Sequence, residues 1–268
     1  MSSSEFGMLS KVKMLQLISA GVDHVPFTLI PPATTIAGNV GAYAEPIAEH
    51  VVAMTLAVYK NLLDRHDQLV NGIFEHEKEN RILKGSTCVI LGFGGIGKAT
   101  ARLLRCFGTR ILAINTSGST DEEVEFVGTL KDLESVLRLG DVIVIALPLT
   151  NSTRGLLASR ELEWMKENAT LVNVARAEII DEAALFERLK AYPSFNAAID
   201  VWWIEPTRNE KFQPIYPFLT LPNVISSPHN SGSVPNIFSK AAGYAAENVK
   251  RFCNNEQIIG VASRNDYT

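Results

Sequence analysis

Between residues 87 and 226, short apolar runs alternate with stretches in which apolar residues recur every three or four positions. The short runs are typical of buried strands, and the spaced stretches indicate helices with one apolar face. Strands and helices that alternate in this way predict an α/β fold with a doubly wound parallel sheet. The expected strands are 88–91, 110–115, 141–147, 170–174, 197–201 and 223–226. One expected helix begins near Ile96, and three others span 130–139, 157–167 and 181–191.

Two longer helical patterns lie outside this alternation. Residues 46–67 predict one long connecting helix, with Pro46 in its first turn, where the missing N–H costs nothing. Residues 234–254 predict a final helix, and its partial apolar face consists of Ile237, Ala241, Tyr244 and Val249.

The N-terminal part of the chain predicts two short strands, one after Lys11 and one within 34–39. The first strand runs into the small-residue turn Ser19-Ala20-Gly21. Free backbone N–H groups in such a turn suit an anionic substrate group. A plain strand end is the alternative, and this segment alone favours it.

A glycine motif, Gly92-x-Gly94-x-x-Gly97, follows the strand at 88–91 and opens the next helix. Gly92 permits a tight turn, Gly94 lets a pyrophosphate approach the backbone, and Gly97 lets the helix pack on the strand. A glycine triplet alone is weak evidence, but here a strand stands on either side of the helix that it opens. The pattern therefore predicts a Rossmann-type dinucleotide site.

Composition and charge narrow the function classes. The net charge of −4 and the isoelectric point near 5.8 provide no basic field, so we expect no nucleic-acid partner. The apolar runs are too short to span a membrane. The three cysteines are scattered, without the spacing of metal ligands or disulfide frameworks, so we expect reduced thiols, a cytoplasmic protein and no metal site.

Polar residues stand where several predicted strands end, which is where ligands bind in such sheets. Arg176 follows the strand at 170–174, and a guanidinium there can hold a carboxylate through two hydrogen bonds. A surface arginine is an equally good interpretation of that position alone. Asp200, Glu205 and His229 follow the last two strands. A histidine and a carboxylate on the same rim can pair, which fixes the imidazole tautomer and gives a proton donor.

Taken together, these blocks resemble the D-isomer-specific 2-hydroxyacid dehydrogenase family. The matching blocks are Ser19-Ala20-Gly21-Val22-Asp23, Ala44 to His50, Gly92 to Gly97, Asn173-Val174-Ala175-Arg176, and Asp200-Val201 through Glu205-Pro206 to Ser227-Pro228-His229. They occur in the family's order and extend over nearly the whole chain.

The resemblance implies a role for each matched position. His229 would be the general acid and base, Glu205 its carboxylate partner, and Arg176 the ligand of the substrate carboxylate, helped by backbone N–H groups around Ala20 and Gly21. Asp200 would bind the nicotinamide carboxamide. The further cofactor contacts would be Gly92, Gly94, Gly95, Ile96, Gly97, Asn115, Thr116, Ser117, Pro148, Thr153, Val174 and Ala175. The implied reaction is hydride transfer between NAD(P)H and a small 2-oxo acid, such as glyoxylate or hydroxypyruvate.

The resemblance does not decide between NAD and NADP. NAD-specific members carry an acidic residue where this chain has Asn115, followed by Thr116 and Ser117. Without that carboxylate, a 2′-phosphate is not repelled and hydroxyls are available to bind it, although no arginine stands in residues 115–120. We therefore expect NAD or NADP, with a slight preference for NADP.

We expect a partial, flavodoxin-like substrate domain over 1–42, a dinucleotide-binding domain over 43–232, and a C-terminal helix within 233–268 that returns to the substrate domain. Family members carry a longer segment before the strand at Lys11, so we expect either a truncated chain or a short natural form completed by a partner subunit. The resemblance also implies a homodimer. A nucleotide-binding regulatory protein of the corepressor type, or a form that binds cofactor without turnover, remains open as an alternative.

Overall fold

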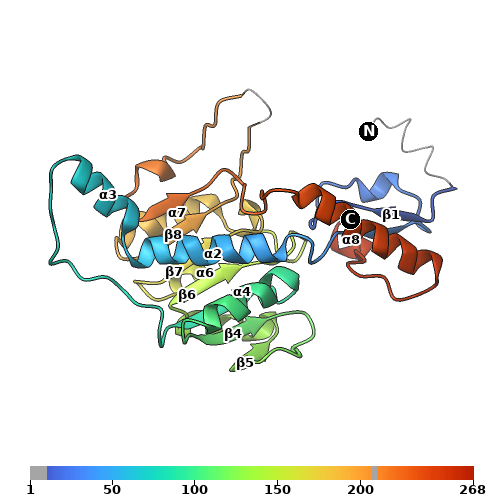
Figure 1. Cartoon of the computed structure of the whole chain (residues 1–268), viewed down its shortest axis with the longest axis horizontal. Helices are drawn as coiled ribbons and strands as arrows, with labels where there is room; N and C mark the ends of the chain where they lie inside the picture. The colour runs from blue at the N-terminus through green and yellow to red at the C-terminus, as the bar shows by residue number, and fades with distance from the viewer. Residues whose placement is uncertain (1–10, 207–209) are drawn as a thin grey trace.

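The computed structural model describes residues 11–206 and 210–268, and this part of the chain contains a seven-stranded, fully parallel sheet (Figure 1). The strand order is β5-β4-β3-β6-β7-β8-β9. The strands are β3 (Thr87–Leu91), β4 (Arg110–Ile114), β5 (Phe126–Gly128), β6 (Val142–Ile145), β7 (Thr170–Asn173), β8 (Asn196–Ile199) and β9 (Val224–Ser226). The predicted doubly wound α/β fold is confirmed.

The chain order reverses around β3, which pairs with β4 on one side and with β6 on the other. The chain runs from β3 outward through β4 to β5, and then returns to β6 and proceeds outward in the opposite direction. A crevice forms at such a reversal, beyond the carboxyl ends of the strands. This topology therefore directs the loops after β3, β4, β6, β7 and β8 to one edge of the sheet.

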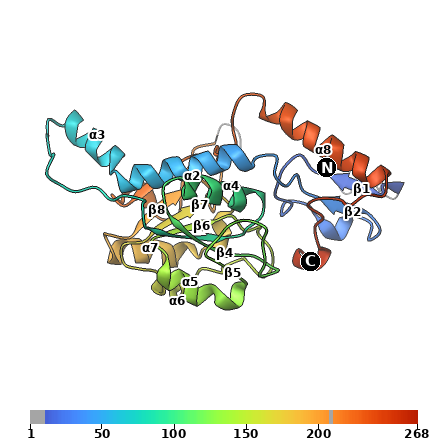
Figure 2. The same cartoon turned by 60° about the horizontal axis from the view of Figure 1, so that its bottom comes forward.

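Alternate residues of β3 belong to two different cores, one on each face of the sheet. Cys88 and Ile90 pack with apolar residues of α2 (Ala44–Tyr59) and α4 (Gly95–Arg105). Val89 and Leu91 pack with apolar residues of α5 (Leu133–Leu139), α6 (Ser159–Glu163) and α7 (Glu182–Ala191). Because helices cover both faces (Figure 2), the central strands β3, β6 and β7 are buried at every position rather than alternating.

A smaller unit joins the two ends of the described chain. The parallel strands β1 (Met14–Gln16) and β2 (Thr35–Ala37) lie beside α8 (Ile237–Cys253), as Figure 1 shows. The C-terminal segment adds to this small sheet, because the N–H of Ala262 donates to Ile36 O at 2.8 Å. Tyr267 stacks on Phe27 with ring centroids 4.6 Å apart. The predicted domain boundaries at residues 42 and 232 remain predictions.

Three local predictions were wrong. The helix predicted over 46–67 is two helices, because Asn61 adopts a left-handed conformation (φ 49°) between α2 and α3 (Leu62–Val70). In α8, Ile237 and Ala241 are buried as predicted, but Tyr244 and Val249 are exposed, and Ala245 and Asn248 complete the buried face. The helix predicted over 157–167 is shorter and is confined to α6. Strand β5 was not predicted.

Within residues 11–206 and 210–268, no helix combines the length and the apolar character that a membrane span needs.

Candidate active site

The sequence-predicted residues gather along the carboxyl edge of the sheet. Gly92, Gly94, Gly95, Ile96 and Gly97 follow β3, Asn115, Thr116 and Ser117 follow β4, Pro148 and Thr153 follow β6, Val174, Ala175 and Arg176 follow β7, Asp200 and Glu205 follow β8, and His229 follows β9. Ala20 and Gly21 follow β1 in the small unit.

Two of the three glycines of the motif, Gly92 and Gly97, are required by steric contacts. Gly92 has φ +95°, and a Cβ there would lie 2.5 Å from the carbonyl carbon of Ala146. A Cβ on Gly97 would lie 2.1 Å from Gly92 O, so only glycine lets α4 begin this close to β3. At Gly94, in contrast, a Cβ would meet no heavy atom of the described chain within 4 Å. That open space before the N-terminus of α4 fits a pyrophosphate group, because the first N–H groups of a helix have no partner within the helix.

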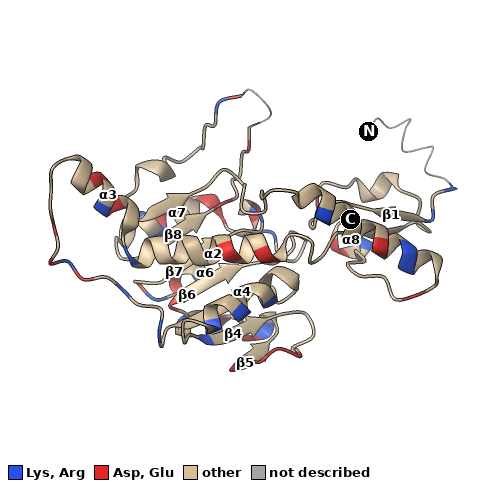
Figure 3. Cartoon of the chain, viewed as in Figure 1, with Lys and Arg blue, Asp and Glu red and all other residues tan. Residues whose placement is uncertain are grey.

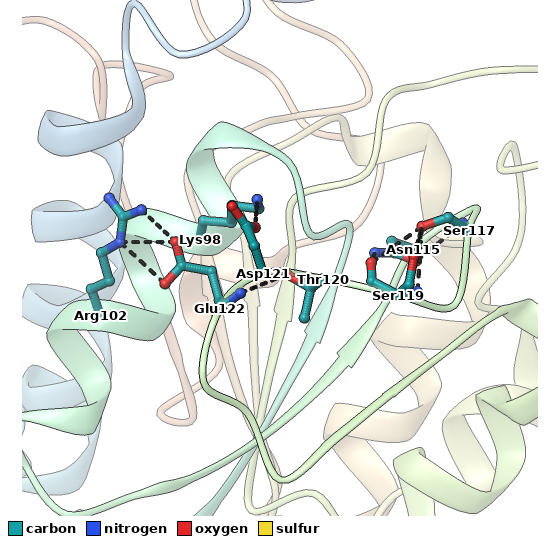
Figure 4. Close-up of polar contacts among 8 residues, drawn as sticks. All are labelled: Lys98, Arg102, Asn115, Ser117, Ser119, Thr120, Asp121 and Glu122. Atoms are coloured by element: carbon teal, nitrogen blue, oxygen red, sulfur yellow. Dashed lines mark hydrogen bonds and ion pairs between the residues drawn. The ribbon is translucent and has the colours of Figure 1, made fainter.

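The turn after β4 is organised by Asn115 (Figure 4). Its Oδ1 accepts hydrogen bonds from Ser117 N (3.1 Å) and Gly118 N (2.7 Å), and its Nδ2 donates to Ser119 O at 2.7 Å. The amide of Asn115 is therefore engaged in holding its own turn. The hydroxyls of Ser117 and Ser119 lie on this exposed turn.

Acidic residues that follow this turn neutralise the basic face of α4 (Figures 3 and 4). Lys98 pairs with Asp121, and Arg102 pairs with Glu122. The turn therefore lies beside cations that already have carboxylate partners.

The loop after β7 presents Arg176 to the small unit. Asn173 fixes this loop, since its Oδ1 accepts from Ala175 N and its Nδ2 donates to Arg176 O. The guanidinium then donates from Nε to Asp23 Oδ2 at 3.1 Å. Its Nη2 lies so close to the turn after β1 that a Cβ on Gly21 would be 2.4 Å away. The structure thus brings Arg176 and Gly21 together, as the resemblance implies.

Asp200 is fully buried at the end of β8, and its carboxylate holds the loop after β9. Ser227 Oγ donates to Oδ1 at 2.5 Å, Asn230 N donates to Oδ1 at 3.1 Å, and Ser231 N donates to Oδ2 at 3.2 Å. Burial by itself raises the pKa of Asp200, but the hydrogen bonds from Ser227, Ser231 and Asn230 outweigh it and hold the pKa below its ordinary value.

His229 and Glu205 form a close pair on the rim of the site. His229 Nδ1 lies 2.8 and 2.9 Å from the two carboxylate oxygens of Glu205, and Oε1 of Glu205 also accepts from Trp202 N at 3.1 Å. Because a carboxylate only accepts hydrogen bonds, Nδ1 carries the hydrogen. Nε2 is then the ring nitrogen that can exchange a proton with a ligand.

Sequence reasoning missed two residues at this edge. Asp23 closes the Ser19–Asp23 block but received no role, and Ser227 stands two residues before His229. Both residues lie in sequence blocks that match the family, which could have marked them as candidates. The spacing of the residues does not predict which side chains they contact. The tryptophans between Asp200 and Glu205 pack into the core, where Trp203 stacks on Phe218.

The family model for the NAD-binding domain of the D-isomer-specific 2-hydroxyacid dehydrogenases matches residues 52–231. The chain is 37% identical over 172 residues to a glyoxylate reductase of Thermococcus gammatolerans, and the aligned region covers 64% of this chain and 50% of that protein. It is 30% identical over 257 residues to a D-3-phosphoglycerate dehydrogenase of Methanocaldococcus jannaschii, and the aligned region covers 94% of this chain and 48% of that protein.

A solved structure, described as a putative formate dehydrogenase from Pyrobaculum aerophilum, superimposes with a TM-score of 0.86 at 30% identity and covers 100% of this chain and 87% of that one. The chain spans about half the length of the first curated relatives that it matches. The match to the family model takes in the glycine motif, Arg176, the His229–Glu205 pair and all seven strands of the large sheet. The chain therefore belongs to the D-isomer-specific 2-hydroxyacid dehydrogenase family.

Proposed function

We propose that this protein is an NAD(P)-dependent oxidoreductase that interconverts a small 2-oxo acid, such as glyoxylate or hydroxypyruvate, and the corresponding D-2-hydroxy acid. The observation that carries this proposal is the His229–Glu205 pair at the same sheet edge as the open glycine turn. A proton donor and a dinucleotide cradle at one edge are what carbonyl reduction by a nicotinamide requires. The similarity to a glyoxylate reductase supports the same substrate class.

The chain's own residues provide two functions in this reaction. His229 gives the proton on Nε2 to the carbonyl oxygen during reduction and takes it back during oxidation, while Glu205 holds Nδ1–H and stabilises the imidazolium. Arg176 binds the substrate carboxylate, and its charge also stabilises negative charge that develops on the neighbouring oxygen. A bound nicotinamide cofactor supplies the hydride chemistry, and the motif at Gly92–Gly97 and Asp200 would hold it.

Within this proposal, NADPH is used somewhat better than NADH. Asn115 places no carboxylate at the end of β4, and Ser117 and Ser119 offer hydroxyls to a 2′-phosphate. The preference is modest because Lys98 and Arg102 are already paired with Asp121 and Glu122. These two cations therefore add little attraction for a phosphate.

We also propose that the protein forms a homodimer through α3 and the segment that follows it. Every residue of α3 is at least partly exposed, and its apolar side chains include Leu62, Leu63, Leu69 and Val70, followed by Phe74, which is 78% exposed. An apolar projection of this kind is costly to leave in water, and a second copy of the chain would cover it.

We also propose that the protein acts in the reducing environment of the cytoplasm, because Cys88, Cys106 and Cys253 are all free thiols.

Loss of nicotinamide absorbance with glyoxylate and with hydroxypyruvate, measured with NADH and NADPH in parallel, tests the proposed activity. We expect turnover with both cofactors. Cofactor binding detected by fluorescence, without turnover of either acid, would overturn the proposed activity in favour of a regulatory role for the bound nucleotide.

A further inference from the structure

A chain of hydrogen bonds links α2 to the loop that carries His229. His50, on α2, places Nε2 2.9 Å from Ser227 Oγ. Ser227 Oγ in turn lies 2.5 Å from Asp200 Oδ1. These three side chains come from α2, from the loop after β9 and from the end of β8. The reaction described above assigns no role to His50 or to Ser227.

The direction of these hydrogen bonds follows from Asp200, the acceptor at the end of the series. The ionised carboxylate of Asp200 can only accept, so the hydroxyl hydrogen of Ser227 points to Oδ1. Ser227 Oγ is then free to accept, and its neighbour at 2.9 Å must donate. His50 therefore carries a hydrogen on Nε2. Hydrogen bonds arranged in one direction polarise and strengthen one another.

The loop beyond Asp200 needs such support. His229 has φ +51°, a left-handed conformation that non-glycine residues adopt at a cost of about 1 kcal/mol or more. Three bonds to Asp200 hold this conformation, since the N–H groups of His229, Asn230 and Ser231 donate to its backbone O, Oδ1 and Oδ2 respectively. Any looseness in the Asp200 carboxylate is transmitted directly to the position of His229.

We propose that His50 is a positioning residue, which acts through Ser227 and Asp200 to hold the loop that presents His229. In this proposal, His50 acts through its contact with Ser227 rather than on the substrate or the cofactor. Its link to catalysis rests on the proposed function, but its effect on the loop does not. If the His50 side chain only filled space between α2 and the loop after β9, its tautomer and its hydrogen-bond donor would not matter.

The first test is the protonation state of His50 in the free protein, read from imidazole nitrogen chemical shifts in ¹⁵N-labelled protein at neutral pH. His50→Gln provides the assignment, because its spectrum lacks this one imidazole. We expect a protonated Nε2. A hydrogen on Nδ1 with a bare Nε2 would overturn the proposal, because the Ser227 hydroxyl would then have to donate to His50 and not to Asp200.

The second test is amide hydrogen exchange at Asn230 and Ser231. In His50→Leu, we expect these two amides to exchange about tenfold faster, while amides of β3 exchange as in the wild type. Glu49→Gln, an exposed change in the same turn of α2, is the matched control and leaves both rates unchanged. Unchanged exchange at Asn230 and Ser231 in a folded His50→Leu protein would contradict the proposed link.

A double-mutant cycle then separates positioning from space filling. When His50→Leu is introduced into the wild type, we expect the cofactor affinity and kcat each to fall by about tenfold. When it is introduced into Ser227→Ala, we expect almost no further loss, because His50 acts through Ser227. His50→Gln, which retains an N–H donor, should restore most of the loss. His50→Ala, which also removes the donor, replaces His50→Leu in this cycle if the leucine protein fails to fold. Independent, additive losses would overturn the proposal.

If neither acid is turned over, the proposed function fails, but the imidazole shifts, the amide exchange and NADPH binding by fluorescence still decide the role of His50.

Discussion

At the scale of single residues, Asp200 links stability to pH. Hydrogen bonds hold the pKa of Asp200 below its ordinary value of 3.8 in the folded protein, so the unfolded chain binds a proton first as the pH falls. The carboxylate therefore contributes stability that is fully present above that ordinary value and is lost as the pH falls through the lower folded pKa.

Asp200→Asn removes this contribution. We expect the free energy of unfolding to fall by about 1–3 kcal/mol at neutral pH, because one amide replaces a carboxylate that accepts three hydrogen bonds. Urea unfolding of both proteins between about pH 3 and pH 7, a range that includes the ordinary titration of a carboxyl group, measures the difference. The difference in the free energy of unfolding between the two proteins should become smaller as the pH approaches about 3. A gap that is constant over the whole range would contradict this account of Asp200.

Asp23 illustrates a residue that acts through another. Its carboxylate accepts from Arg176 Nε and leaves the Nη2 edge of the guanidinium beside Gly21. We expect Asp23→Ala to raise KM for a 2-oxo acid by about tenfold with little change in kcat, since only the orientation of the guanidinium is lost. Asp23→Asn retains an acceptor and should stay near the wild-type KM. Equal KM values for all three proteins would show that Asp23 does not position Arg176.

How far these residues could be predicted depended on their place in the chain. His229 and Glu205 both follow strands on one edge of a parallel sheet, so their pairing could be expected from the topology that the sequence predicted. The contact between Asp23 and Arg176 joins positions 153 residues apart, in different parts of the molecule. No local periodicity encodes that contact, and only the folded arrangement of the small unit against β7 produces it.

At the scale of elements, the turn after β4 tests the cofactor preference. Asn115→Asp keeps the acceptor for the N–H groups of Ser117 and Gly118 but adds a negative charge. That charge repels a 2′-phosphate and can accept a bond from a ribose hydroxyl. We expect the ratio of kcat/KM for NADPH over NADH to fall about tenfold or more.

Asn115→Ser serves as the neutral control for this turn. It should leave the cofactor ratio within about twofold of the wild type, because its charge is unchanged. A fall of the same size in both variants would assign the effect to turn geometry rather than to charge.

Elements were predicted well where the pattern was buried and poorly where it was exposed. The central strands are buried at every position because helices cover both faces of the sheet, and their nearly continuous apolar runs are a strong signal in the sequence. Strand β5 is a three-residue edge strand whose first residue, Phe126, is exposed, so its pattern is short and mixed. The break at Asn61 was hidden because Leu62 continues the apolar spacing of α2 although its own side chain faces solvent.

At the scale of the whole molecule, the apolar projection formed by α3 and the following segment predicts self-association. We expect the wild type to sediment as a dimer and Leu69→Glu/Phe74→Glu to sediment as a monomer, because two buried charges would oppose the contact. Phe238→Glu, on α8, is the matched control, since Phe238 is equally exposed but lies in the small unit. A dimer that survives the α3 changes but dissociates with Phe238→Glu would place the contact on the other face.

We propose that His229, at the carboxyl edge of the seven-stranded sheet, is the acid and base of a hydride transfer. The most direct measurement compares the wild type with His229→Gln for the rate of NADPH oxidation by glyoxylate, alongside NADPH affinity by fluorescence. We predict unchanged cofactor affinity and a loss of about 10²–10⁴-fold in kcat for His229→Gln, the range expected when a positioned proton donor is removed. Oxidation of NADPH at the wild-type rate by His229→Gln would contradict the account.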